Sequence, residues 1–278
     1  MKYSIFSSIA IICVTTVLYS CNSQNKADIS ATHFNKGNNF LFSDDYNNAK
    51  SEFNLAIKTD SSNWRAYYQL ATMQQLEGDY QTAYQNLTKA IQINPKSSLA
   101  FYSRANLAEL GGNERGALMD LDSAIARKKD FYSAILSKAR ADYGKGNFKQ
   151  ALLLFNDAIS LRSDFYLVFS MRGSCKYKIG DLAGAIEDFT SEIKLRPDFA
   201  MAYLNRSTIY AEQKNYRAAL DDINKTLKLE PMFSQAFIYR GICYFNLDRK
   251  DSARADFKLA QSMHNPQADE CLKKYFGK

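Results

Sequence analysis

The sequence has little of the material from which metal centres and catalytic sites are built. Its 278 residues include 2 histidines and 5 cysteines, and no two of those cysteines stand in a Cys-x-x-Cys spacing. The chain has no Gly-x-Ser-x-Gly motif, no His-Glu-x-x-His motif and no phosphate-binding loop. We therefore expect no metal, no cofactor and no enzymatic chemistry.

Blocks of one charge and long apolar runs are also lacking. Lys and Arg number 36 against 29 Asp and Glu, and this formal net charge of +7 is spread along the chain. Such a distribution argues against a nucleic-acid-binding arm. The longest apolar run, Ile5 to Leu18, is broken by Ser and Thr and is shorter than the roughly 20 residues of a membrane-spanning helix.

That apolar run begins shortly after Lys2, which is typical of a secretory signal peptide and predicts one over residues 1–20. It ends in Leu18-Tyr19-Ser20-Cys21, which resembles the bacterial lipobox, although Tyr19 replaces the usual small residue. The resemblance implies cleavage before Cys21 and lipidation of its sulfur and amine. Plain secretion, with Cys21 incidental, is the alternative.

The residues after the cysteine bear on location. Residues 21–29 are polar and are predicted to form a lipidated tether. In enteric-type bacteria an Asp after the lipidated cysteine retains lipoproteins at the inner membrane, and this chain has Asn22 instead. We therefore expect an outer-membrane anchor, with the folded part facing the periplasm.

A period of 34 residues organises the rest of the chain. Seven alanines recur at this step, with a small residue twelve positions before each and a large apolar residue four positions after. The alanines are Ala49, Ala83, Ala117, Ala151, Ala185, Ala219 and Ala253. With the alanine as position 20, the four prolines fall at positions 32 and 33.

This pattern resembles the tetratricopeptide repeat, with a small residue at position 8, Gly at 15, Ala at 20 and 27, and Pro at 32. The resemblance covers residues 30–267. It implies an all-α fold: a right-handed α-solenoid of seven repeats, each an antiparallel pair of helices A and B. A short amphipathic segment at 268–278 is predicted to be a capping helix. Position 11 in repeats two to five and position 27 in repeats five and six depart from the pattern, so looser packing is expected there.

Charges at positions 7 and 23 vary together. Four repeats pair Arg at position 7 with Asp at position 23, which predicts ion pairs between helices A and B: Arg104 with Asp120, Arg172 with Asp188, Arg206 with Asp222, and Arg240 with Asp256. Lys36 and Glu52 are predicted to pair in the same way. Repeat two has Leu70 and Asn86, so both charges are lost there together.

The family resemblance also locates a binding surface, because positions 2, 5, 9 and 12 of helix A line a concave groove in such proteins. The groove residues predicted here are Arg65, Tyr68, Tyr102, Asn106, Arg140, Tyr143 and Tyr177. Tyrosines among polar groups suit the binding of an extended peptide. We therefore expect a membrane-anchored adaptor for another envelope protein.

Two alternatives remain open at this stage. A tyrosine-lined groove also suits stacking on sugar rings, which would make the protein a glycan-binding or glycan-assembly accessory. The apolar Ile238, Ile242 and Phe245 near the C-terminal end would instead mark a self-association surface. Cys175 and Cys243 occupy core positions, and a disulfide between Cys243 and Cys271 is left open.

Overall fold

The structure is a computed structural model that describes residues 24–277. The predicted signal peptide and the lipidation site at Cys21 lie outside the described residues. Every regular element in the described part of the chain is a helix. None of these helices is both long and apolar enough to cross a membrane.

The helices alternate in the order that the 34-residue period predicts. The A helices are a first helix that occupies 24–42 of the described chain, then α3 (Trp64–Leu76), α5 (Ser98–Leu110), α7 (Tyr132–Gly144), α9 (Tyr166–Lys178), α11 (Ala200–Glu212) and α13 (Ser234–Asn246). The B helices are α2 (Tyr46–Thr59), α4 (Tyr80–Ile93), α6 (Glu114–Arg127), α8 (Phe148–Leu161), α10 (Leu182–Leu195), α12 (Tyr216–Leu229) and α14 (Lys250–Ser262). A last helix, α15 (Ala268–Phe276), follows them.

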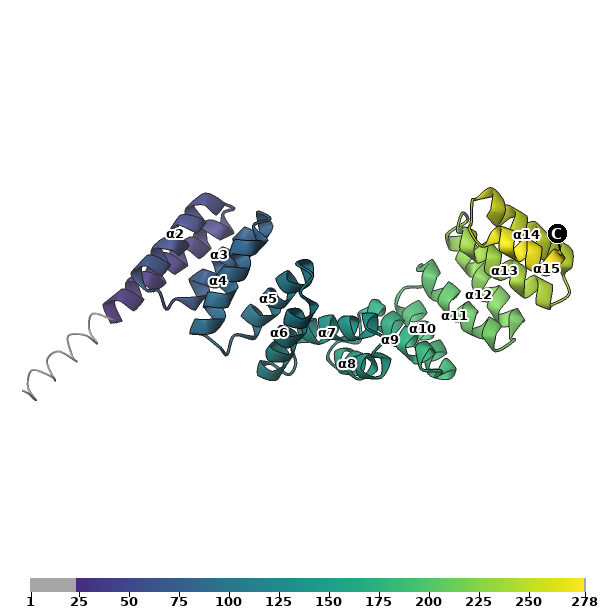
Figure 1. Ribbon diagram of the computed structural model, residues 1–278, viewed down its shortest axis with the longest axis horizontal. Helices are drawn as coiled ribbons and strands as arrows, with labels where there is room; N and C mark the ends of the chain where they lie inside the picture. The colour runs from purple at the N-terminus through teal and green to yellow at the C-terminus, as the bar shows by residue number, and fades with distance from the viewer. Residues whose placement is uncertain (1–23, 278) are drawn as a thin grey trace, which may run out of the picture. The chain divides into compact units, whose positions relative to one another are not determined.

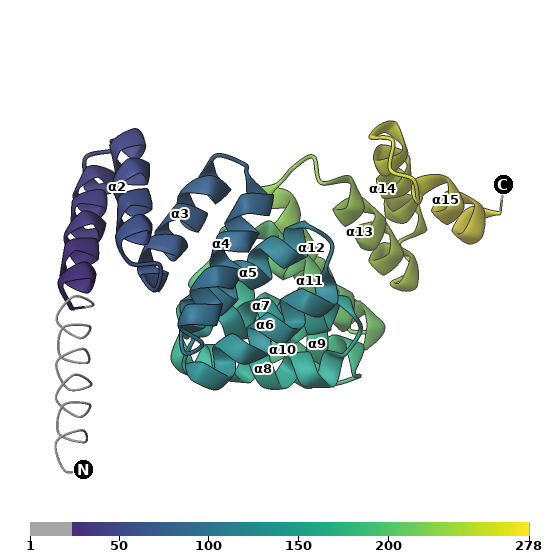
Figure 2. The same cartoon turned by 60° about the vertical axis from the view of Figure 1, so that its left-hand side comes forward.

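The chain divides into two compact units within α7, at Ala134 and Ile135. In unit 1, α2 packs on α3, α3 on α4, α4 on α5 and α5 on α6 (Figure 1). In unit 2, each helix from α8 to α15 packs on the next in the same way (Figure 2). Each unit is therefore a stack of helix pairs, and the all-α repeat architecture predicted from the sequence is confirmed.

One difference from the sequence prediction lies at the N-terminal end. Residues 24–29, expected to be part of a polar tether, are helical and continue without a break into helix A of the first repeat. Their side chains are exposed up to Ser30, which is buried and donates its hydroxyl to the Ala56 carbonyl at 2.8 Å. The first packed residue is thus Ser30, where the first repeat was predicted to begin.

Local sequence signals set the bounds of each helix pair. Position 15 adopts a left-handed backbone in every repeat, with φ between 58° and 86°. Glycine occupies it in repeats two to five, as predicted, because glycine adopts this conformation without steric cost. The next residue caps helix B: the side chains of Asp45, Asp79, Asn113, Asp181 and Asn215 each accept a hydrogen bond from the backbone N–H three residues on.

Close packing explains why small residues recur. All seven position-20 alanines and all seven large residues at position 24 are buried. A Cβ added to Gly241 would lie 2.5 Å from the Phe257 ring, and one added to Gly37 would lie 2.6 Å from the Phe53 ring. Glycine at position 8 therefore lets helix A rest directly on an aromatic ring of helix B.

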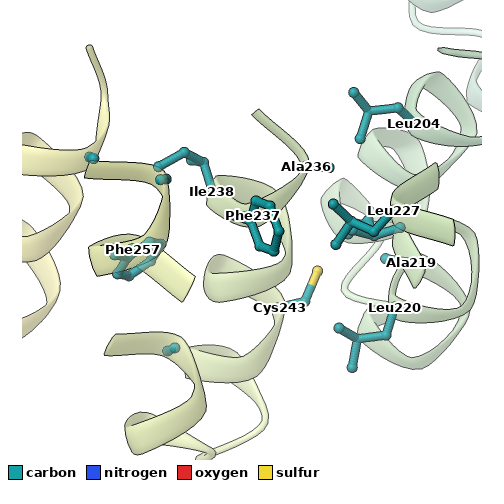
Figure 3. Packing of buried hydrophobic residues seen from close by; sticks show 13 residues of the cluster. Leu204, Ala219, Leu220, Leu227, Ala236, Phe237, Ile238, Cys243 and Phe257 are labelled. Carbon is teal, nitrogen blue, oxygen red and sulfur yellow. The ribbon is translucent and has the colours of Figure 1, made fainter. Parts of the chain in front are cut away.

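The C-terminal end of unit 2 has its own core. Figure 3 shows Phe237 and Cys243 of α13 between Phe257 of α14 on one side and Leu220 and Leu227 of α12 on the other. The described cysteines, Cys175, Cys243 and Cys271, are all free. Burial raises the pKa of the Cys175 and Cys243 thiols to about 11, in keeping with the core positions predicted for them.

Helix α15 covers the residues that the sequence offered as a self-association surface. Ile238 is buried, and Ile242 packs against the same core. The Phe245 ring lies 4.7 Å from Tyr275 and 5.7 Å from Phe276, measured between ring centroids. These residues therefore do not form an open docking patch, because the apolar face of the amphipathic helix α15 packs over them.

The four predicted Arg–Asp pairs are present and are bidentate. The nitrogen–oxygen distances lie between 2.6 and 2.9 Å. Each arginine also donates from Nη1 to position 25 of the preceding repeat, where the acceptors are Thr88, Asn156, Thr190 and Asn224. These arginines therefore join three helices and two repeats, which sequence covariation within a repeat does not indicate.

The first repeat departs from this scheme. Glu52 was predicted to pair with Lys36, but its Oε2 lies 2.7 Å from Nδ1 of His33. His33 is half-buried at position 4 and stands on the same face of the helix as position 7, one turn earlier. Glu52 therefore does form an interhelical pair, but its partner is His33 and not Lys36.

Unusual residues at position 11 also find partners. Asn86, which replaces Asp at position 23 in repeat two, donates to Oε1 of Gln74 at 2.8 Å. In repeat five, Lys176 lies 3.1 Å from Asp188, which already binds Arg172. In these two repeats the polar residue at position 11 is thus paired with the residue at position 23.

Candidate functional site

The predicted groove residues of unit 1 lie on two consecutive A helices, α3 and α5, and are partly packed. Tyr68 and Tyr102 are half-buried against the core of unit 1, and Tyr102 lies 5.1 Å from the ring of Phe131. The Tyr68 hydroxyl accepts a hydrogen bond from Ser103 of the next repeat at 3.4 Å. Both tyrosines therefore contribute to repeat packing as well as to surface.

Arg65 and Asn106 complete the predicted set in this unit. Arg65 is exposed, with its guanidinium 5.1 Å from the centroid of the Trp64 ring. Asn106 is half-buried. Guanidinium and amide groups donate hydrogen bonds to carbonyl oxygens, so this face offers polar donors between aromatic rings.

In unit 2, two predicted residues line a pocket of about 210 Å³. Arg140 and Tyr143 of α7 form one wall, and the remaining lining residues are Phe155 of α8 and Ser170, Met171 and Ser174 of α9. The Tyr143 ring is held edge-on against Phe148 at 5.4 Å, which fixes its orientation. Arg140 is exposed at this pocket. The structure thus brings together a cation, an aromatic ring and two hydroxyls.

Tyr177 does not line that pocket. It lies at the end of α9, is exposed, and interacts with Glu212 at the end of α11. Hydrogen bonding to the Glu212 carboxylate raises the pKa of the Tyr177 phenol, because the protonated phenol is the donor. Of the residues predicted for this part of the groove, Arg140 and Tyr143 therefore meet in one pocket, and Tyr177 lies apart from it.

Sequence reasoning missed an apolar edge in unit 1. Position 13, at the end of helix A, carries Phe42, Leu76 and Leu110, which are 95%, 76% and 65% exposed. A hollow of about 430 Å³ beside this edge is lined by Leu110, Tyr80 and Tyr84 among others. The available signal was that position 13 is apolar in repeats one to three and polar or glycine afterwards.

These surfaces combine hydrogen-bond donors with aromatic rings. Among residues 24–277, no group of three or more His, Cys, Asp or Glu side chains is placed to hold a metal ion. Arg140 and Arg65 supply donors, and the tyrosines supply flat apolar faces with a polar end. Both features suit contacts with the backbone and side chains of a bound chain.

Protein-family profiles match segments of the chain that contain the predicted repeats. Tetratricopeptide repeat profiles match residues 30–63, 65–97, 170–225 and 204–268. Together these segments span more than half of the chain. No curated protein shows a significant match.

Solved structures show the same fold at low sequence identity. The C-terminal part of a repeat-containing protein from Cytophaga hutchinsonii is 19% identical with a TM-score of 0.69, covering 86% of this chain and 99% of that one. YrrB, whose structure is described as having an unusual peptide-binding site, is 20% identical with a TM-score of 0.62, covering 66% and 95%. A protein from Parabacteroides merdae is 20% identical with a TM-score of 0.57, covering 88% and 98%.

Proposed function

Because this chain belongs to the tetratricopeptide repeat family, we propose that it is a membrane-anchored scaffold that binds an extended segment of another envelope protein. The observation that carries the proposal is the pocket between α7, α8 and α9. There Arg140 and Tyr143, both predicted from the groove positions that the family resemblance implies, stand beside the hydroxyls of Ser170 and Ser174. Repeat stacks of this kind act by presenting long surfaces to partners.

The mode of binding follows from the side chains present. An extended peptide exposes carbonyl and N–H groups along its length, and specificity comes from pockets that take its side chains. Arg140 offers donors for carbonyls, and the pocket of about 210 Å³ offers room for a side chain. YrrB, which shares the fold, is a precedent for peptide binding by such a stack.

Anchoring is the second part of the proposal. It rests on the resemblance of Leu18-Tyr19-Ser20-Cys21 to a lipobox, with Asn22 favouring the outer membrane and a periplasm-facing chain. Several acyl chains, each contributing about 0.8 kcal/mol per buried methylene, give lasting attachment. In a bacterial host, Cys21→Ser is expected to abolish incorporation of labelled palmitate and release the chain from membranes. Unchanged membrane association of this variant would contradict the anchor.

Site-specific photo-crosslinking in cells tests the scaffold. A benzophenone amino acid replaces Arg140 in the pocket, and the matched control replaces Lys228, which is exposed on α12 in the same unit. We expect a discrete adduct from position 140 only, with mass spectrometry mapping the crosslink to one extended segment of one envelope protein. The same adducts from both positions, or an adduct that contains this chain alone, would contradict the scaffold; the latter would establish self-association.

A further inference from the structure

The apolar edge of unit 1 is left open to solvent. Phe42, Leu76 and Leu110 are all largely exposed, so no part of residues 24–277 covers them. Tyr46 and Tyr80, at position 17 of the first two repeats, are half exposed and add aromatic rings to the same turns. A single exposed leucine is ordinary on a protein surface, but its recurrence at one position of three consecutive repeats indicates a surface for interaction.

Consecutive A helices of unit 1 contact one another directly. Gln69 of α3 donates a hydrogen bond to Asn38 of the first helix at 3.1 Å, and Ser103 of α5 donates to Tyr68 of α3 at 3.4 Å. Helices in contact lie roughly 8–10 Å apart, so the side chains at position 13 follow one another at about that interval. Residues seven apart on an α-helix recur about every 10.5 Å. The apolar stripe of a docked helix therefore matches the spacing of the apolar edge.

A hollow of about 430 Å³ gives the apolar edge depth between the second and third repeats. Helix α4 contributes Tyr80 and Tyr84 to its lining, and α5 contributes Leu107 and Leu110. An amphipathic helix is held by apolar side chains that enter a hydrophobic groove. This hollow offers such a helix one place for an apolar side chain to enter.

The rim of the apolar edge is acidic. Positions 12–18 of the first three repeats contain one basic residue, Arg115, and six acidic residues, which are Asp44, Asp45, Glu77, Asp79, Glu109 and Glu114. Lys50 lies 2.8 Å from Glu77 and offsets one of these charges. The same positions in repeats four to seven contain four acidic and seven basic residues, and their position 13 is never apolar. Acidic charge and exposed apolar side chains thus coincide in unit 1.

We propose that the apolar edge is a docking surface for an amphipathic helix of a protein partner, whose polar face is rich in Lys or Arg. The apolar stripe of that helix covers Phe42, Leu76 and Leu110, and its cations face the acidic rim. Like charges across an interface cost free energy, which disfavours an acidic helix and an anionic membrane surface here. The apolar edge lies in unit 1 and the pocket of the proposed function in unit 2, so this inference does not depend on that pocket.

A designed peptide tests the proposal. The probe is a dye-labelled peptide of roughly 18 Leu and Lys residues, with leucines at intervals of three and four so that they form one stripe. One comparison peptide has Glu in place of every Lys, and a second has the same composition in an order that forms no stripe. The protein is the whole chain from residue 21, with Cys21→Ser so that no lipid is attached. We expect saturable binding of the Lys peptide by fluorescence anisotropy, and at least tenfold weaker binding of both comparisons.

Matched variants locate the binding. Leu110→Ser and Glu109→Lys change exposed side chains of the apolar edge and its rim, so urea unfolding should be unaltered while Lys-peptide binding weakens at least fivefold. The controls make the same changes at exposed sites of unit 2, Leu153→Ser on α8 and Glu187→Lys on α10, and should bind as the native chain does. Equal weakening in the controls, or native binding by Leu110→Ser and Glu109→Lys, would overturn the assignment.

Two other occupants would give different results. A second copy would appear in sedimentation as a dimer that Leu76→Ser disperses and the Lys peptide does not displace. A bilayer would appear as flotation with phosphatidylcholine vesicles that Leu76→Ser abolishes. Either result would overturn the helix assignment. The crosslink from position 140 is expected to survive Leu110→Ser, so failure of this inference is distinguishable from failure of the scaffold.

Discussion

Glu192 is expected to make its part of unit 2 less stable as the pH rises from 5 to 8. Its pKa in the folded chain is raised from 4.5 to about 7 by burial. Below pH 4.5 the carboxyl is protonated in both the folded and unfolded chain, so it imposes no charge penalty. Between these values the unfolded chain ionises first, and the folded chain loses relative stability until its own carboxyl ionises near pH 7.

The size of this loss follows from the two pKa values. A tenfold difference in proton affinity corresponds to about 1.36 kcal/mol, so a rise from 4.5 to about 7 corresponds to a loss of about 3 kcal/mol when complete. Glu192 is fully shielded from solvent, which weakens screening of the buried charge. Most of the loss should be visible between pH 5 and pH 8.

Native-state hydrogen exchange measures the effect locally, which suits a repeat protein whose parts open separately. The free energy of opening for α10 amides should fall about 2–3 kcal/mol more in the native chain than in Glu192→Gln over this pH range, after correction for intrinsic exchange rates. Amides of α3, in unit 1, serve as the internal reference. Parallel pH profiles for the two chains would refute the reasoning.

Two further predictions concern stability at neutral pH, followed by urea unfolding. Asp222→Ala should lower the free energy of unfolding by about 3 kcal/mol, because it leaves the half-buried Arg206 without its bidentate partner. Replacement of the exposed neighbour, Asp221→Ala, should change it little. Equal losses in the two variants would contradict the ion-pair assignment. Gly180→Ala should lower the free energy of unfolding by about 1–2 kcal/mol, because the backbone φ of 86° disfavours a Cβ even though no atom lies within 4 Å of the added methyl. Gly144→Ala, in helix α7, should raise the free energy of unfolding by about 0.5–1 kcal/mol. A change of the same sign in both variants would refute a backbone origin.

The helix pairs could be predicted because the same packing constraint selects the same type of residue at the same position of each repeat. Alanine at position 20 and glycine or alanine at position 8 recur because the helices approach closely there: a Cβ added to Gly241 would lie only 2.5 Å from the Phe257 ring. The Arg–Asp pairs could be predicted because their partners lie in one repeat at a fixed separation. Both kinds of information are local in sequence and repeated along it.

The binding surface could be predicted only in outline. The groove positions implied by the family resemblance placed Arg140 and Tyr143 on one surface, but they gave no indication that Tyr68 and Tyr102 are half-buried in helix packing. They also assigned Phe245 to an open surface that α15 covers. Exposure depends on which neighbouring helix lies over a residue, and a repeat position does not specify that neighbour at the end of a stack.

Sequence by itself determined the all-α fold, the seven repeats, their turns and the pairs that hold helix A on helix B. Tertiary structure alone decided which partner Glu52 takes, that each arginine also reaches the preceding repeat, and that Glu192 is fully buried. The physical reason is that the two kinds of interaction act over different separations along the chain. Helix periodicity and turn geometry act over a few residues, whereas burial and hydrogen-bond satisfaction depend on side chains that only the packing of separate helices brings into contact.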